Sequence, residues 1–232
     1  TYVVKMVIIM YTSSRGDYML NIRTYSLGPV QTNCYIVSNK EKECIIFDPG
    51  EEGDKLVKEI RGNGLKPLAI FLTHAHFDHI GAVDRLRNEF KIPLYIHEAE
   101  VSWLNDPMKN GSGKYAELPN YVVAPPAEEH IIRNEQTCTL GTFVFDAVFT
   151  PGHSPGSISY IFREDGFAIV GDTLFERSVG RTDLIGGSTK VLLQSINNKL
   201  LTLDDETYIY PGHGSFTTPK AEKEHNPFLN GF

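Results

Sequence analysis

Three histidines and one aspartate fall within six residues of a single segment, Thr73-His74-Ala75-His76-Phe77-Asp78-His79. Divalent metals such as zinc prefer imidazole nitrogen and carboxylate oxygen as ligands. His74 and His76 are two residues apart, so an extended chain projects both side chains to the same side. Asp78 and His79 follow where the chain is expected to turn, and they could face a second metal. The segment therefore predicts two pairs of ligands for two adjacent metal ions.

Three further candidates share one local pattern, in which an apolar strand-like run ends at a glycine and a ligand-type side chain comes next. They are His153, Asp172 and His213. Glycine permits the tight turn that aims the next side chain inward. A single histidine or aspartate at such a position is as often a cap or a turn residue. Together with the first segment, however, these three complete a ligand set.

The seven side chains divide between two sites that share one carboxylate: His74, His76 and His153 in the first, Asp78, His79 and His213 in the second, and Asp172 in both. A carboxylate has two oxygens that can hold two cations about 3.5–4 Å apart. Water between the metals would ionise near neutral pH, because metal binding lowers its pKa towards about 7. We therefore expect a metal-bridging hydroxide as the nucleophile, with Asp78 and Asp172 as the carboxylates of the catalytic centre. No serine, cysteine or lysine nucleophile with an adjacent base is evident elsewhere.

The residues on either side of the first segment predict the elements that hold it. The run 68–72 is short and apolar, which predicts a buried strand. After the segment, Ile80, Val83, Leu86 and Phe90 recur at helical spacing and predict a helix. The ligands therefore lie at a strand-to-helix turn, which is where open α/β sheets place their ligands.

Short apolar runs between turn residues predict the other strands, and amphipathic runs predict the other helices. The strands are expected at 20–27, 33–38, 43–47, 93–97, 131–133, 137–140, 142–149, 157–162, 167–171 and 207–210. The helices are expected at 54–60, 98–104, 191–203 (capped by Ser188 or Thr189) and 220–225. Each half of the chain thus runs from strands into helix. We expect an α/β fold with two sheets packed face to face and helices on the outside.

Two segments stand apart from this pattern. Residues 105–127 are rich in proline, glycine and asparagine and predict a long loop, which could equally be a lid over the site or a plain surface insertion. Residues 1–18 combine an apolar, strand-like run with a polar connector and are interpreted as an N-terminal extension, with Met19 as a candidate natural start. Residues 19–232 are then expected to form a single domain.

Composition limits the classes of partner. The net charge of −7 argues against nucleic acid, which is bound by clusters of lysine and arginine. No apolar stretch approaches the roughly 20 residues that span a bilayer, so no membrane partner is expected. The three cysteines, Cys34, Cys44 and Cys138, have spacings that suggest no disulfide framework and indicate a cytoplasmic protein with reduced thiols.

The motif His-x-His-x-Asp-His at 74–79, with Gly-His-Ser-Pro-Gly at 152–156, Gly171-Asp172 and Gly212-His213, resembles the metallo-β-lactamase superfamily. That resemblance implies a four-layer αββα sandwich, in which two mixed β-sheets are flanked by helices. Within the superfamily, the runs at 171–175, 180–183 and 226–229 are similar to the glyoxalase II group and its short bacterial relatives. Asp48 matches a segment near the metals, where an outer carboxylate orients a ligand histidine.

The resemblance implies hydrolysis of an S-2-hydroxyacylglutathione-type thioester with two divalent metals, zinc first and iron or manganese as alternatives. A thiol has a pKa near 8.5, so it can leave without a general acid. Glyoxalase II itself has a C-terminal helical domain that helps grip glutathione, whereas only 19 residues follow His213 here. The candidate replacements for those contacts are basic and tyrosine side chains: Arg177, Arg181, Lys114, Tyr115 and Tyr121. For Arg181, an ion pair with Asp183 is slightly favoured over a substrate contact.

Three alternatives remain at this point. The run Gly-Arg-Thr-Asp at 180–183 is shared with persulfide dioxygenases, in which one iron is held by the equivalents of His74, His153 and Asp172. Such an oxidoreductase keeps all seven positions, so the ligands do not exclude it. A metallo-hydrolase of this superfamily could also act on a lactone, a β-lactam or a phosphodiester. An inactive metal-binding protein is disfavoured because no ligand position is substituted. The oligomeric state is left open.

Overall fold

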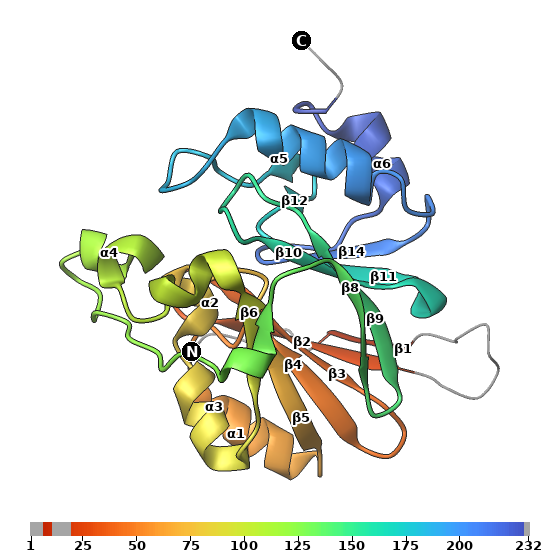
Figure 1. The fold of residues 1–232 in the computed structure, drawn as a ribbon. Helices are drawn as coiled ribbons and strands as arrows, with labels where there is room; N and C mark the ends of the chain where they lie inside the picture. The colour runs from red at the N-terminus through yellow and green to blue at the C-terminus, as the bar shows by residue number, and fades with distance from the viewer. Residues whose placement is uncertain (1–6, 11–19, 230–232) are drawn as a thin grey trace. The chain divides into compact units, whose positions relative to one another are not determined.

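The structure, a computed structural model, describes residues 7–10 and 20–229. The chain divides into two compact units, Thr1–Arg133 (unit 1) and Asn134–Phe232 (unit 2). Each unit is built on one large β-sheet of its own (Figure 1).

Unit 1 contains a seven-stranded sheet whose strands lie side by side in chain order. The strands are β1 (Val7–Met10), β2 (Asn21–Leu27), β3 (Thr32–Ser38), β4 (Glu43–Phe47), β5 (Lys66–Phe71), β6 (Leu94–His97) and β7 (Ile131–Ile132). The strands from β1 to β4 pair antiparallel, and those from β4 to β7 pair parallel. The sheet is therefore mixed, and parallel neighbours require the crossover helices that connect them.

Helices α1 (Gly53–Gly62) and α3 (Val83–Phe90) lie side by side on one face of this sheet (Figure 1). Leu56 and Leu86, one from each helix, are fully buried in a core that also contains Ile46 and Ile70 of the sheet. Burying each leucine contributes about 1.5–3 kcal/mol relative to exposing it. This packing fixes the carboxyl end of β5, from which the histidine-rich segment leaves.

Unit 2 contains a five-stranded sheet in the order β14-β11-β10-β9-β8 and a separate small hairpin. The sheet strands are β8 (Gln136–Leu140), β9 (Phe143–Phe149), β10 (Ile158–Phe162), β11 (Phe167–Gly171) and β14 (Tyr208–Pro211); the hairpin strands are β12 (Leu174–Phe175) and β13 (Ser178–Val179). Only the β11–β14 pair of this sheet is parallel. The second sheet is therefore also mixed.

Helix α5 (Thr189–Ser195) runs into a π-helical turn at Ile196–Leu200, and both pack on this sheet. Its first turn is capped by Ser188, whose hydroxyl accepts a hydrogen bond from the Val191 amide, which satisfies one of the amides left free at a helix start. Helix α6 (Pro219–His225) is the last helix of the described chain and lies near α5 (Figure 1).

The predicted α/β class with two mixed sheets and flanking helices is confirmed. Residues 98–104 form a 3₁₀ helix, η1 (Glu98–Trp103), in place of an α-helix. The predicted loop 105–127 contains a short helix, α4 (Pro107–Asn110), because the Asp106 carboxylate caps its amides and Pro107 is suited to a first turn. The hairpin β12–β13 was not predicted, since strands of two residues are too short to show alternation.

The predicted helix after the histidine-rich segment is two helices, α2 (Phe77–Ile80) and α3, with Asp78 and His79 inside the first. The described part of the predicted N-terminal extension is strand β1, which pairs with β2. The candidate start at Met19 and the rest of 1–18 lie outside the described residues. No helix in the described parts of the chain is long and apolar enough to cross a membrane.

The cysteines provide a test of this packing. Cys34 and Cys44 are buried in unit 1 and Cys138 is half-buried in unit 2. Burial raises the pKa of Cys34 well above its usual range. It also raises the pKa of Cys44 to about 12 and that of Cys138 to about 11. Only the thiolate reacts with alkylating reagents, so in the folded chain Cys34 and Cys44 should be unreactive and Cys138 should react slowly.

Alkylation of the folded protein with iodoacetamide at pH 8, followed by mass spectrometry, should modify Cys138 slowly and leave Cys34 and Cys44 unmodified. At that pH only about one in a thousand Cys138 thiols is ionised, and the rate should rise tenfold per pH unit. Unfolding in guanidinium should expose all three cysteines. Rapid labelling of Cys34 in the folded chain would contradict the described core.

Candidate metal centre

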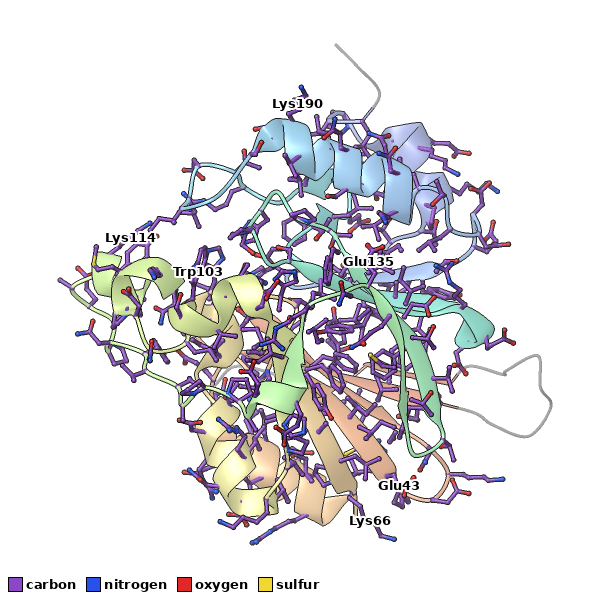
Figure 2. All side chains as sticks on the ribbon, viewed as in Figure 1. Glu43, Lys66, Trp103, Lys114, Glu135 and Lys190 are labelled. Atoms are coloured by element: carbon purple, nitrogen blue, oxygen red, sulfur yellow. The ribbon has the colours of Figure 1, made fainter. Side chains whose placement is uncertain are left out.

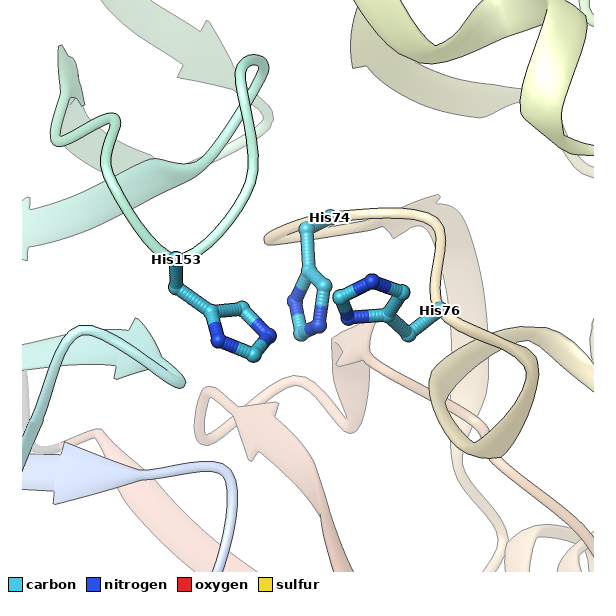
Figure 3. A group of neighbouring side chains, drawn as sticks. All are labelled: His74, His76 and His153. Carbon is cyan, nitrogen blue, oxygen red and sulfur yellow. The ribbon is translucent and has the colours of Figure 1, made fainter. Parts of the chain in front are cut away.

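The three histidines of the first segment are buried in unit 1, around the loop that follows β5 and the start of α2. The rings of His74 and His76 lie side by side (Figure 3), with centroids 4.8 Å apart and nearly perpendicular planes. The His79 ring lies 4.1 Å from that of His74. The predicted clustering of these side chains is therefore present within unit 1.

Asp78 lies in the first turn of α2, and its Oδ2 is 3.4 Å from Nε2 of His79. The Thr32 hydroxyl donates to the same carboxylate oxygen at 2.7 Å and fixes its direction. Gly50 packs so closely on this turn that a Cβ there would lie 1.8 Å from the carbonyl oxygen of Asp78. Only glycine allows this approach.

Asp48 organises the same region through hydrogen bonds to Thr73 and His79. It is buried, and its backbone is in the left-handed region, with φ of 49°, which is uncommon for a residue with a side chain. Its Oδ1 accepts a hydrogen bond from the Thr73 amide at 2.7 Å, and its Oδ2 accepts one from the Thr73 hydroxyl at 2.6 Å. The same Oδ2 is 3.0 Å from Nδ1 of His79.

These contacts determine which ring nitrogens are available to a metal. A carboxylate only accepts, so His79 carries its proton on Nδ1 and presents the Nε2 lone pair. The Thr73 hydroxyl gives its proton to Asp48, so its oxygen accepts from Nδ1 of His74, 3.1 Å away. His74 therefore also presents Nε2. A single carboxylate thus sets the tautomer of two ligand candidates.

The 3₁₀ helix η1 supports the loop that carries His74 and His76. The Glu100 carboxylate is fully buried and accepts a hydrogen bond at 2.6 Å from the amide of Ala75, which lies between the two histidines. The ring of Trp103, labelled in Figure 2, packs 5.7 Å from that of His76. Sequence reasoning missed Glu100 and Thr32, because neither belongs to a recognisable motif of ligands, and it assigned no role to Thr73 at the start of the first segment.

In unit 2 two of the ligand candidates, His153 and His213, lie near the carboxylate of the third, Asp172. His153 leaves the turn between β9 and β10 (Figure 3), and its Nδ1 donates to the carbonyl oxygen of Arg181 at 2.8 Å. Its Nε2 then lies 3.7 Å from Oδ2 of Asp172. Nε2 of His213, after β14, lies 3.5 Å from the same oxygen. The Nε2 atoms of two imidazoles therefore lie near one carboxylate oxygen.

Close backbone contacts hold the turn of His153. Gly152 has φ of 131°, and a Cβ there would lie 2.2 Å from the Leu192 amide nitrogen of α5. The Ser188 amide donates to the Gly152 carbonyl at 2.8 Å, and the Ser195 hydroxyl donates to the Pro151 carbonyl at 2.7 Å. Helix α5 is therefore built directly against the turn that aims His153.

The predicted substrate contacts of unit 2 are on its surface. Arg181 forms a two-pronged ion pair with Asp183, at 2.7 and 2.8 Å, and both side chains are exposed. The ion pair that was slightly favoured over a substrate contact is therefore formed. The Arg177 side chain is exposed, while its backbone amide donates to Glu222.

The predicted substrate contacts of unit 1 lie on or after α4. Lys114 is exposed (Figure 2), and the half-exposed ring of Tyr115 lies 6.1 Å from that of Phe77, which stands between two ligand candidates. The Tyr121 ring packs 5.8 Å from Phe77, and its hydroxyl donates to Glu51. Burial and this hydrogen bond raise the pKa of Tyr121 far above its usual range. Tyr121 thus supports Phe77 and ties the segment to the loop that precedes α1.

The donor set fits a divalent metal. All seven predicted side chains offer a nitrogen or oxygen atom suited to coordination, four in unit 1 and three in unit 2. Nδ1 of three histidines is held by a carboxylate, a hydroxyl or a carbonyl: His74, His79 and His153. Outer partners of this kind orient metal-ligating histidines and raise their basicity. Imidazole and carboxylate accept zinc, iron and manganese, so the donors do not name the metal.

Replacing Asp48 with asparagine should weaken metal binding about 10- to 100-fold, because the new amide NH₂ would face the donors of Thr73 and His79. Titration of the metal-free protein with Co²⁺, followed by absorption, measures this. Asp54→Asn, at an exposed position of α1, is the matched control and should bind as the parent does. Unchanged cobalt affinity in Asp48→Asn would contradict the role of this carboxylate.

Known proteins that are similar to this chain agree on its family. The family model for the metallo-β-lactamase superfamily matches residues 27–213. The probable metallo-hydrolase YqgX of Bacillus subtilis is 48% identical over 210 residues, which are 90% of this chain and 98% of YqgX. The hydroxyacylglutathione hydrolase GloC of Haemophilus influenzae is 35% identical over 211 residues, 91% of this chain and 99% of GloC.

Solved structures agree with these relatives. The crystal structure of the BLEG-1 B3 metallo-β-lactamase is similar with a TM-score of 0.87 and 48% identity, covering 90% of this chain and all of that one. TTHA1623 in a di-iron-bound form has a TM-score of 0.77 and 36% identity, covering 89% and 99%. ETHE1 from Myxococcus xanthus has a TM-score of 0.70 and 28% identity, covering 90% and 84%. With the family model and the relatives matching most of its length, this chain is a metallo-hydrolase that belongs to the metallo-β-lactamase superfamily.

Proposed function

We propose that this protein hydrolyses a small thioester of the S-2-hydroxyacylglutathione type. The observation that carries the proposal is the relationship with GloC, which extends along 99% of GloC itself. GloC is named for this activity, and the match covers nearly all of it as well as 91% of this chain. No nucleic-acid or membrane partner is part of the proposal, and a cytoplasmic location remains an expectation.

The proposed centre joins the ligands of both units. One divalent metal would be held by His74, His76 and His153, a second by Asp78, His79 and His213, and Asp172 would bridge them. Support comes from the donor atoms that all seven offer and from the family model, whose match runs through both units. Zinc is the first expectation for both metals, with iron or manganese as alternatives.

The chain's own residues have defined tasks in this reaction. When bound, the metals would supply an acidified water as nucleophile and a Lewis acid for the thioester carbonyl. Asp48 and Thr73 keep two imidazoles in the tautomer that binds through Nε2, and Thr32 holds the carboxylate of Asp78. Because these partners are in place beforehand, little reorganisation is needed during the reaction.

The thiol leaving group needs no general acid from the protein. A thiol ionises near pH 8.5, so it departs as thiolate close to neutral pH. Recognition of the acyl and thiol parts is assigned to the surfaces around Phe77, with Tyr115 and Lys114, and around Arg177. Arg181 is left out of this assignment because its guanidinium is paired with Asp183.

Asp172→Ala should reduce turnover of S-lactoylglutathione at least about 100-fold, because loss of a shared ligand removes several kcal/mol of transition-state stabilisation. Loss of the thioester absorbance measures the rate. Asp204→Ala, at an exposed position of the same unit, should be as active as the parent. An Asp172→Ala variant with parental turnover would refute the proposed centre, and a parent protein inactive on thioesters would refute the substrate class.

A second candidate is oxygen-dependent oxidation of a persulfide, which the likeness to ETHE1 and the 180–183 run favour. That chemistry uses a single iron held by two histidines and one carboxylate. Elemental analysis of freshly purified protein should find two metals per chain if the hydrolase proposal is correct. One iron per chain, with oxygen uptake on glutathione persulfide, would favour the dioxygenase instead.

A third candidate is β-lactam hydrolysis, because BLEG-1, named as a metallo-β-lactamase, is 48% identical to this chain. A thioester and a β-lactam both present a carbonyl group to a metal centre, so the ligand candidates of this chain do not decide between the two substrates. Removing the metals with a chelator and restoring them should abolish and recover thioester hydrolysis. Comparing kcat/KM for S-lactoylglutathione and a chromogenic cephalosporin decides the preference, and we expect the thioester to be favoured.

A further inference from the structure

The segment 174–181, which contains the hairpin β12–β13 and the two residues after it, contacts every ligand candidate of unit 2. It begins two residues after Asp172, and the ring of Phe175 meets that of His213 edge-on at 6.2 Å. Just past the hairpin, Gly180 packs on Asp172 so tightly that a Cβ would lie 1.8 Å from the Asp172 carbonyl oxygen. The next residue supplies the carbonyl that accepts the Nδ1 proton of His153. This segment therefore has a direct contact with each of the three ligand candidates.

A buried carboxylate in α6 holds the hairpin turn. Glu222 is fully buried, and both of its oxygens accept hydrogen bonds from the backbone amide of Arg177, at 3.2 and 3.0 Å. Arg177 sits in the turn with φ of 57°, a left-handed conformation that is uncommon for a residue with a side chain. Glu222 accepts hydrogen bonds from the amide of this residue and so stabilises the turn.

Two more donors complete the surroundings of Glu222. The Thr217 hydroxyl donates to Oε1, and the Asn226 side-chain amide donates to Oε2 at 2.7 Å. The same Asn226 amide also donates to the Ser178 carbonyl at 3.1 Å, so it reaches the second strand of the hairpin directly. Asn226 is fully buried as well. The end of the described chain is thus bound to both the turn and a strand of the hairpin.

The donor pattern requires a carboxylate at position 222. Each oxygen of Glu222 receives donors, and all the contacts recorded for it in the described part of the chain come from neutral N–H and O–H groups. A glutamine there would turn an NH₂ group towards one set of donors and leave a buried polar contact unmade. The substitution changes the hydrogen bonding while keeping the volume of the side chain.

We infer that Glu222 is a positioning residue for the metal ligands of unit 2, acting through the β12–β13 hairpin, with Asn226 as its partner. Glu222 does not touch the ligands. It fixes the turn at Arg177, the turn sets Phe175, Gly180 and the Arg181 carbonyl, and these direct the three ligands. The inference rests on the proposed metal centre, because it assigns those ligands a metal to hold.

The test compares Glu222→Gln with Glu224→Gln, a matched change at an exposed position of the same helix. The full-length, metal-free proteins are titrated with Co²⁺ alone, with visible absorption and competition by a chelating dye as readouts. Glu222→Gln should bind cobalt about 10- to 100-fold more weakly, with an altered spectrum, and Glu224→Gln should match the parent. Amide exchange at Arg177 should accelerate only in Glu222→Gln.

Thr217→Val is a milder second variant. It removes one hydrogen-bond donor to Glu222 and keeps the shape of the side chain at position 217. It should weaken cobalt binding several-fold, and it carries the test if circular dichroism shows that Glu222→Gln does not fold. Parental cobalt affinity and spectrum in a folded Glu222→Gln, or in Thr217→Val when the first variant is unfolded, would overturn the inference. Parent protein that binds cobalt but leaves thioesters intact would refute the proposed function alone.

Discussion

The arrangement of unit 1 depends on one buried carboxylate, Asp48, both of whose oxygens accept hydrogen bonds. Asp48 accepts from the amide and hydroxyl of Thr73 and from a ring nitrogen of His79. A buried charge is costly unless it is hydrogen-bonded on all sides, so these partners have little freedom to move. The same bonds fix two imidazoles in the form that binds metal. Stability of the loop and competence of the ligands therefore come from one set of contacts.

Both units position an aspartate ligand by the same device, a glycine pressed against its backbone carbonyl. Gly50 approaches Asp78 in unit 1, and Gly180 approaches Asp172 in unit 2. Any side chain at either glycine would displace the carbonyl and rotate the carboxylate with it. Each unit also contains a buried carboxylate that accepts only neutral or imidazole donors, Asp48 in the first and Glu222 in the second. The ligands are thus held by backbone shape as much as by side-chain contacts.

Relatives named for different chemistries share the superfamily, so membership of it does not name the substrate. We expect selectivity to depend on the surfaces beside the ligand candidates. In unit 1 that surface has internal structure: Asn110, fully buried, donates from its amide to the carbonyls of Trp103 and Tyr121. The ring of Phe77 is thereby backed by a supported tyrosine. An aromatic face of this kind selects by shape, while Lys114, next to Tyr115 in the chain, is exposed.

The sequence by itself predicted the ligand candidates and the class of fold. The spacing of His74, His76, Asp78 and His79 is local, and so is the alternation that predicts strands, so both could be read without a structure. A role for Asp48 followed from the family resemblance, but its partners did not, because the orienting contacts join segments far apart: Thr73 with Asp48 across 25 residues, Asp78 with Thr32 across 46, and Arg177 with Glu222 across 45. Threonine, glutamate and asparagine at those positions carry no motif. Tertiary structure decided their roles, because a hydrogen bond depends on distance in space and leaves no period along the chain.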